Sequence, residues 1–239
     1  MDRRKAIKSI AGMAAAGIAS SSAAEVITSH TELPTQLSSE LVPEMVDRKG
    51  GLSYLTASEA RMVAAIFDRL IPADELSISA SEAGCVEFVD RQLSGDFGKA
   101  KSMYMQGPFK IGLPEAGPQT RQTPAERYRI GLSDLDGYLA KNGGKGFTSL
   151  SADEQDHLLA QLESGAIEFP HTHAKAFFAL LLQNVREGYF ADPIYGGNKD
   201  MAGWKLVGFP GARYDFREQL PRKGQVLKID PVSLADIHR

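Results

Sequence analysis

The sequence predicts an all-α fold, and three observations support this prediction. Apolar residues recur at steps of three and four over much of residues 56–189, which is the period of a helix that buries one side. Four Ser or Thr residues are each followed three positions later by Glu, the capping box that begins a helix. The alternation typical of strands is missing, except for a possible short strand at residues 226–229.

The capping boxes and the apolar stripes locate the predicted helices. The boxes are Thr56/Glu59, Ser79/Glu82, Thr123/Glu126 and Ser151/Glu154, and Pro124 at a first helical position strengthens the third. The stripes are Val63, Ile66, Phe67 and Leu70, then Cys85, Val86, Val89 and Leu93, then Tyr128, Leu132, Leu135, Tyr138 and Leu139, and last Leu158, Leu159 and Leu162. Residues 174–189 are apolar nearly all round, which predicts the central and most buried helix.

The composition excludes several classes of protein. The 239-residue chain is 43% hydrophobic and 24% charged, which argues against disorder. Its formal net charge of −3 suggests no phosphate-binding surface, so a nucleic-acid partner is disfavoured. No apolar run approaches the roughly 20 residues that span a bilayer.

The N-terminus has the layout of an export signal. Arg3 and Arg4 precede a weakly apolar stretch rich in Ala and Gly, and Lys8 follows the arginine pair. Paired arginines point to the twin-arginine (Tat) route, which carries cargo that has already folded. The alternative is a basic amphipathic helix in the cytoplasm.

These features divide the chain into a Tat signal over residues 1–24, a linker or arm over residues 25–53 and a helical domain over residues 54–239. We expect the protein in the periplasm. Cleavage after Ala23 or Ala24 and an uncleaved signal that acts as an anchor both remain open. The protein is therefore either released or held at the membrane, through that signal or through a complex.

A long segment rich in glycine and aromatic residues, residues 189–214, follows the last predicted helix. Irregular segments of this length are usually functional or disordered, and the aromatic content disfavours disorder. We expect an ordered loop that packs on a partner, since Trp and Tyr dominate interface energetics. The predicted interface residues are Tyr189, Phe190, Tyr195, Trp204 and Phe209, with Trp204 as the anchor. Alternatively, the loop only covers its own helices. A second irregular stretch, residues 106–122, is a candidate for a second contact arm.

No catalytic, cofactor-binding or metal site is predicted for this chain. The sequence contains no HExxH, CxxC, CxxCH or GxSxG motif. His171 and His173 are two residues apart and do not share a helix face, so they would chelate a metal only in extended backbone. Cys85, the one cysteine, is a small buried hydrophobe, a disulfide partner for another chain or a reactive thiol.

Seven short motifs resemble the gluconate 2-dehydrogenase subunit 3 family. They are Asp192-Pro-Ile-Tyr-Gly-Gly-Asn198, Gly203-Trp-Lys205, Gly208-Phe-Pro-Gly211, Leu55-Thr56-Ala-Ser-Glu59, Ile71-Pro-Ala-Asp74, Phe88-Val-Asp-Arg-Gln-Leu93 and Thr123-Pro-Ala-Glu-Arg-Tyr-Arg129. The resemblance runs from about Leu55 to Tyr214.

The resemblance implies a non-catalytic small subunit beside a large FAD-binding subunit of the glucose–methanol–choline (GMC) oxidoreductase type, often with a cytochrome c subunit. The FAD belongs to the large subunit and the haem c to the third. Substrates of such complexes are sugars, sugar acids, polyols and glycosides. The small subunit would engage the Tat translocon and bring the large subunit with it. A stand-alone periplasmic binding protein or enzyme is the alternative.

Overall fold

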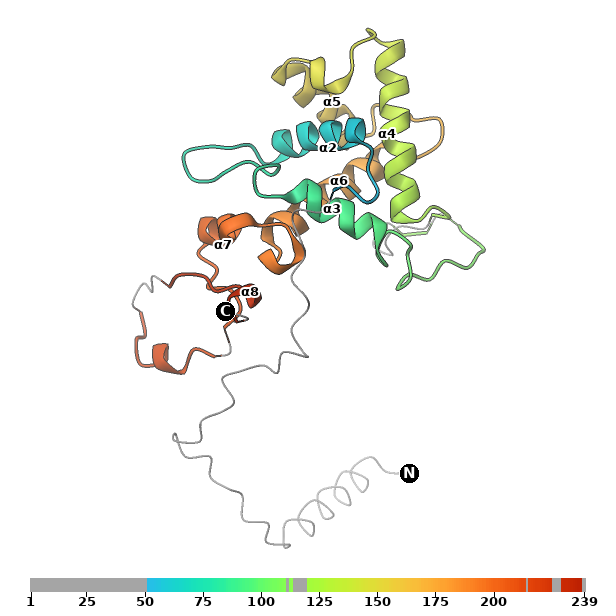
Figure 1. Cartoon of the computed structure of the whole chain (residues 1–239). Coiled ribbons are helices and arrows are strands. Elements are labelled where there is room, and N and C mark those ends of the chain that lie inside the picture. Colours follow the sequence, from blue (N-terminus) through green and yellow to red (C-terminus); the bar gives the residue numbers. More distant parts are fainter. Residues whose placement is uncertain (1–50, 111, 114–119, 214, 225–228, 238–239) are drawn as a thin grey trace, which may run out of the picture. The chain divides into compact units, whose positions relative to one another are not determined.

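The computed structural model describes residues 51–110, 112–113, 120–213, 215–224 and 229–237. The Tat residues Arg3, Arg4 and Lys8 therefore lie outside the described residues, as do nearly all of the predicted linker and most of the strand considered at residues 226–229. Within the described ranges the fold is helical and no strand forms (Figure 1). The all-α prediction is confirmed.

The α-helices are α2 (Ala57–Leu70), α3 (Cys85–Ser94), α4 (Pro124–Lys141), α5 (Ala152–Ser164), α6 (Ala174–Phe190), α7 (Ala202–Val207) and α8 (Leu234–Ile237). Short 3₁₀ turns lie between them: η4 (Phe147–Ser149), η5 (Pro193–Tyr195), η6 (Lys199–Met201) and η7 (Arg217–Gln219). None of the described helices is long and apolar enough to cross a membrane.

Three of the four predicted capping boxes begin a helix, at Thr56, Thr123 and Ser151. The fourth forms its two reciprocal bonds, from Ser79 N to Glu82 Oε2 at 2.9 Å and from Glu82 N to Ser79 Oγ at 3.4 Å. It closes a turn, however, because the next helix begins only at Cys85. Gly84 causes this delay, since its φ of +83° is left-handed and incompatible with a continuous helix.

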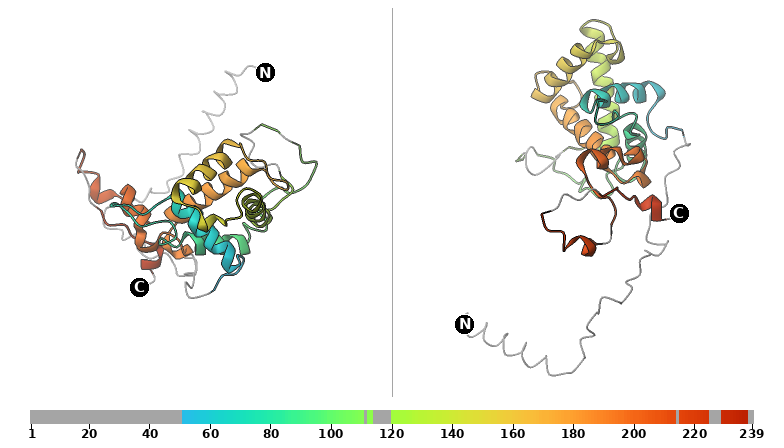
Figure 2. Two further views of the ribbon diagram at one scale, coloured as in Figure 1. Left: turned by 90° about the horizontal axis from the view of Figure 1, so that it is seen from above. Right: turned by 90° about the vertical axis from the view of Figure 1, so that its left-hand side faces the viewer.

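Helix α6 is the centre of the fold, as predicted, and it contacts α2, α3, α4, α5 and α7. The side chains of Phe177, Leu181 and Val185 are fully buried. Figure 2 shows α5 and α6 lying side by side, and α4 runs across the direction of α2 in Figure 1. A Cβ at Gly131 of α4 would lie 2.4 Å from the Phe177 ring, so the absence of a side chain there lets α4 approach α6.

Candidate functional site

The segment after α6 is more regular than the sequence predicts. The chain forms η5, η6 and α7 within residues 193–207, where we expected an irregular loop. Asp192 begins the first of these turns by accepting a hydrogen bond of 2.9 Å from Ile194 N, and Pro193 fixes the backbone at the first helical position. The sequence pattern does not predict these short helices because none of them is long enough to show a helical period.

Asn198 is completely buried, and its side chain links the two ends of this segment by hydrogen bonds. Its side-chain Nδ2 donates to Ala191 O at 2.8 Å, and its Oδ1 accepts from Gly203 N at 2.8 Å. Gly197 lies against α6 so closely that a Cβ there would be 2.2 Å from Gly188 O. The run Gly196-Gly197-Asn198 thus makes contacts within the chain that hold this segment against α6.

Trp204, the predicted anchor, packs within its own chain and is 5% exposed. Its indole Nε1 donates to Phe190 O at 2.8 Å, and its ring meets the Phe209 ring edge-on at a centroid separation of 5.2 Å. Tyr189 is buried as well, and its hydroxyl donates to Ile78 O at 2.7 Å. These two residues have little side-chain surface left to offer a partner.

The other three predicted interface residues are exposed, and two neighbours on α7 join them. The exposed fractions are 40% for Phe190, 38% for Tyr195, 41% for Leu206, 60% for Val207 and 47% for Phe209. We call these five residues the α7 surface. Exposed apolar side chains that form one contiguous patch are a feature of binding surfaces, and these five residues are the candidates for such a patch.

The segment beyond residue 214, for which the sequence predicted no role, contacts the chain again at Asp192 and Gly211. Asp192 accepts hydrogen bonds from Ser233 Oγ at 2.7 Å and from Leu234 N at 2.9 Å, at the start of α8. A parallel β-bridge joins Gly211 to Val232. The C-terminal segment therefore braces the end of the segment that carries the α7 surface.

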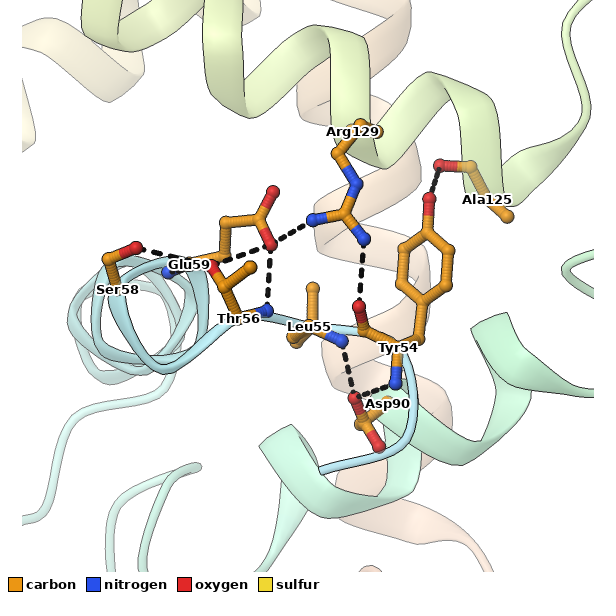
Figure 3. Close-up of polar contacts among 8 residues, drawn as sticks. All are labelled: Tyr54, Leu55, Thr56, Ser58, Glu59, Asp90, Ala125 and Arg129. Carbon is orange, nitrogen blue, oxygen red and sulfur yellow. Dashed lines mark hydrogen bonds and ion pairs between the residues drawn. The ribbon is translucent and has the colours of Figure 1, made fainter. Parts of the chain in front are cut away.

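A second polar cluster joins α2, α3 and α4 (Figure 3). The carboxylate of Asp90 on α3 is buried and accepts three main-chain N–H bonds, from Ser53 at 2.6 Å, Tyr54 at 2.9 Å and Leu55 at 2.7 Å. These bonds satisfy the charge and hold the backbone that leads into α2.

Arg129 of α4 completes the cluster. It forms an ion pair with Glu59, donates to Tyr54 O at 2.8 Å and lies 4.5 Å from the centroid of the Tyr54 ring. Desolvation alone would raise the pKa of Glu59, but hydrogen bonds from Thr56 and Arg129 outweigh it and lower that pKa. Each charged group in the cluster has a partner within the chain, so the cluster serves to hold α2, α3 and α4 together.

Cys85 is fully buried at the start of α3, beside Gly188 of α6. Desolvation, followed by the nearby charges of Glu87 and Asp68, raises the pKa of its thiol to about 12. Thiol reactivity requires the thiolate, so the burial favours the first of our three interpretations, a small core hydrophobe.

The histidine pair lies just before α6. His171 Nδ1 is 2.7 Å from Asp134 Oδ1, and His173 is the N-cap of α6 in extended backbone. No group of three or more potential metal ligands occurs in the part of the chain that the structure describes.

Taken together, these features define a small helical protein whose polar clusters hold its helices together and whose α7 segment exposes large apolar side chains. The family comparison identifies which one: residues 57–211 match gluconate 2-dehydrogenase subunit 3. The match covers more than half of the chain, so the chain belongs to the gluconate 2-dehydrogenase subunit 3 family, whose members are by name subunits of a dehydrogenase complex. Searches of curated proteins and of solved structures gave no match.

Five of the seven motifs that carried the resemblance meet at two places in the fold. Those at 55–59, 88–93 and 123–129 supply Glu59, Asp90 and Arg129 to the cluster of Figure 3. Those at 192–198 and 203–205 supply Asn198 and Trp204 to the joint at the end of α6. The motifs at these two places therefore build the scaffold, and the α7 surface lies on the second joint.

Proposed function

We propose that this chain is the small, non-catalytic subunit of a periplasmic FAD-dependent dehydrogenase of the GMC type that oxidises sugars, sugar acids or glycosides. It provides the Tat signal for the large subunit and supports its maturation and stability. Membership of the subunit 3 family carries this proposal. The arginine pair Arg3-Arg4 supports the export role, since Tat cargo crosses the membrane folded and FAD must be bound beforehand.

In this proposal the large subunit binds FAD, and a cytochrome c subunit with haem c takes the electrons onward. The polar groups of the small subunit serve a structural purpose: Asp90, Glu59 and Arg129 are all engaged in the cluster of Figure 3. The carboxylate of Asp90 accepts three main-chain N–H bonds and so holds the backbone that leads into α2.

The α7 surface is the proposed contact with the large subunit. Its exposed apolar side chains gain about 25 cal/mol for each Å² that a partner covers. The charged residues Lys199, Asp200 and Lys205 lie exposed in the same segment, as a polar rim around an apolar contact would require. Trp204 supports this surface from beneath, through its contact with Phe209.

A double variant, Leu206→Ser with Val207→Ser, tests the contact. Both side chains are exposed, so the chain should keep its melting temperature while its affinity for the co-expressed large subunit falls tenfold or more, about 1.4 kcal/mol. Leu220→Ser is the matched control, because Leu220 is an exposed leucine of the C-terminal segment. Unchanged binding by the double variant would contradict a contact at the α7 surface and favour the arm at residues 106–122 as the contact.

A further inference from the structure

A cavity of about 530 Å³ lies where the N-terminal end of α4 meets the segment that leads into α6. Its lining includes Phe109, Arg121, Arg127, Phe169, His171 and His173. No Asp or Glu of the described ranges lines it. The wall of the cavity therefore carries both cationic and aromatic side chains.

Arg127 is the most unusual of these residues, because it is a buried cation. It is only 8% exposed, and its one described hydrogen bond runs from Nη2 to Ala176 O at 3.0 Å. No carboxylate among the described residues pairs with it. A buried charge without a counter-ion is costly, and Arg127 is one of the residues that line the cavity.

The N-terminus of α6 opens at the same cavity. His173 is the N-cap and makes no capping hydrogen bond, and the main-chain N–H groups of Ala174, Lys175 and Ala176 have no acceptor among the described residues. His173 and Ala176 both line the cavity. The positive end of this 17-residue helix thus adds to the charge of Arg127.

The surrounding contacts hold this arrangement in place. Asp134 accepts hydrogen bonds from His171 N at 3.1 Å and Thr172 N at 3.2 Å, and Gln122 Nε2 donates to His171 O at 3.0 Å. The carboxylate of Asp134 is therefore engaged by His171 and Thr172, and no described ion pair joins it to Arg127.

We propose that this cavity binds a small organic carboxylate. Arg127 and the first N–H groups of α6 hold the carboxylate group, and Phe109 and Phe169 contact the carbon body of the ligand. The volume is within the usual range for small-molecule sites, roughly 300–1,000 Å³. An organic carboxylate fits better than an inorganic anion because the lining also includes the aromatic rings of Phe109 and Phe169.

The test titrates the full chain with sodium gluconate as the probe, against sodium chloride at matched ionic strength. The proposal expects a saturable rise in melting temperature with gluconate and saturable shifts of the Ala174–Ala176 amide resonances. Sodium phosphate, tested in parallel, should bind at least tenfold more weakly. Absence of a saturable response to gluconate, or equal responses to gluconate and phosphate, would overturn the proposal.

Two variants locate the site. Arg127→Met removes the buried charge and should weaken gluconate binding at least tenfold. Because this variant could fail to fold, His173→Asp is the decisive one: an Asp N-cap supplies an internal carboxylate to the same N–H groups and stabilises the helix. It should melt at or above the wild-type temperature and lose the gluconate response. A well-folded His173→Asp chain that binds gluconate as wild type does would contradict the assignment.

Discussion

The indole Nε1 of Trp204 donates a hydrogen bond of 2.8 Å to the main-chain carbonyl of Phe190, the last residue of α6. A carbonyl at a helix C-terminus has no partner within its own helix, so Trp204 satisfies it from α7. This bond joins the central helix to the segment that carries the α7 surface. The position of the α7 surface therefore depends on this contact within the chain.

Trp204→Ala should destabilise the isolated small subunit by about 3–5 kcal/mol, the usual cost of removing a buried aromatic side chain. Trp204→Phe keeps most of the volume and loses the hydrogen bond, so its cost should be smaller. Urea unfolding measures both. A Trp204→Ala chain as stable as wild type that fails to bind the large subunit would instead make Trp204 a direct partner contact.

Gly197→Ala should also destabilise the chain, because its Cβ would lie 2.2 Å from Gly188 O on α6. We expect a loss of about 1–3 kcal/mol or more, as for other overpacked sites. Gly137→Ala is the matched control: Gly137 lies inside α4 with nothing within 4 Å of the added carbon. There alanine should stabilise the helix by about 0.5–1 kcal/mol. Equal effects at both positions would refute the close approach at Gly197.

Glu59 should make stability depend on pH. The hydrogen bonds from Thr56 and Arg129 outweigh desolvation and hold its folded pKa below the unfolded value, which is about 4.3. The stabilisation is therefore fully present above the unfolded pKa and is lost as the pH falls through the folded pKa. Unfolding free energies measured from pH 7 down to about 3 should fall less steeply in Glu59→Gln than in wild type.

The exposed carboxylate Glu163 on α5 provides a comparison for this experiment. Glu163→Gln, which removes a carboxylate from the protein surface, is measured in parallel. At pH 7 Glu59→Gln should also cost about 1–3 kcal/mol, because it removes the charged partner of Arg129. If both variants show the wild-type slope, the cluster of Figure 3 does not stabilise the carboxylate form.

Replacing Arg3 and Arg4 together by lysine should block export of this chain and of the large subunit with it. Cell fractionation should then place the dehydrogenase activity in the cytoplasm. Arg121→Lys, a change of the same type within the helical domain, should leave export unaffected. A large subunit that still reaches the periplasm without the arginine pair would exclude a shared export route.

The sequence predicts the long helices well because each buries one face, so its apolar residues recur with the helical period, as Val63, Ile66 and Phe67 do in α2. It cannot predict the fate of Trp204, because a tryptophan in a glycine-rich segment packs equally well on its own chain or on another. The capping box at Ser79 fails to begin a helix for a similar reason. The outcome depends on the left-handed backbone of Gly84, which packs against Gly196, far away in the sequence.

The cavity lined by Arg127 and His173 could not be predicted from the sequence either. Arg127 lies in a capping segment among other charged residues, and that no carboxylate of the described residues pairs with it is a property of the fold. His173 could be recognised as a residue near a helix start, but the uncapped N–H groups behind it could not.

The most direct test of the central claim is to purify the full chain, tagged at its C-terminus, from its native host and to identify what accompanies it. The proposal predicts a larger flavin-containing subunit, with sugar-dependent dye reduction by the complex and none by the small subunit after the two are separated. A chain that purifies alone and reduces the dye by itself would contradict the account and make the protein a stand-alone enzyme.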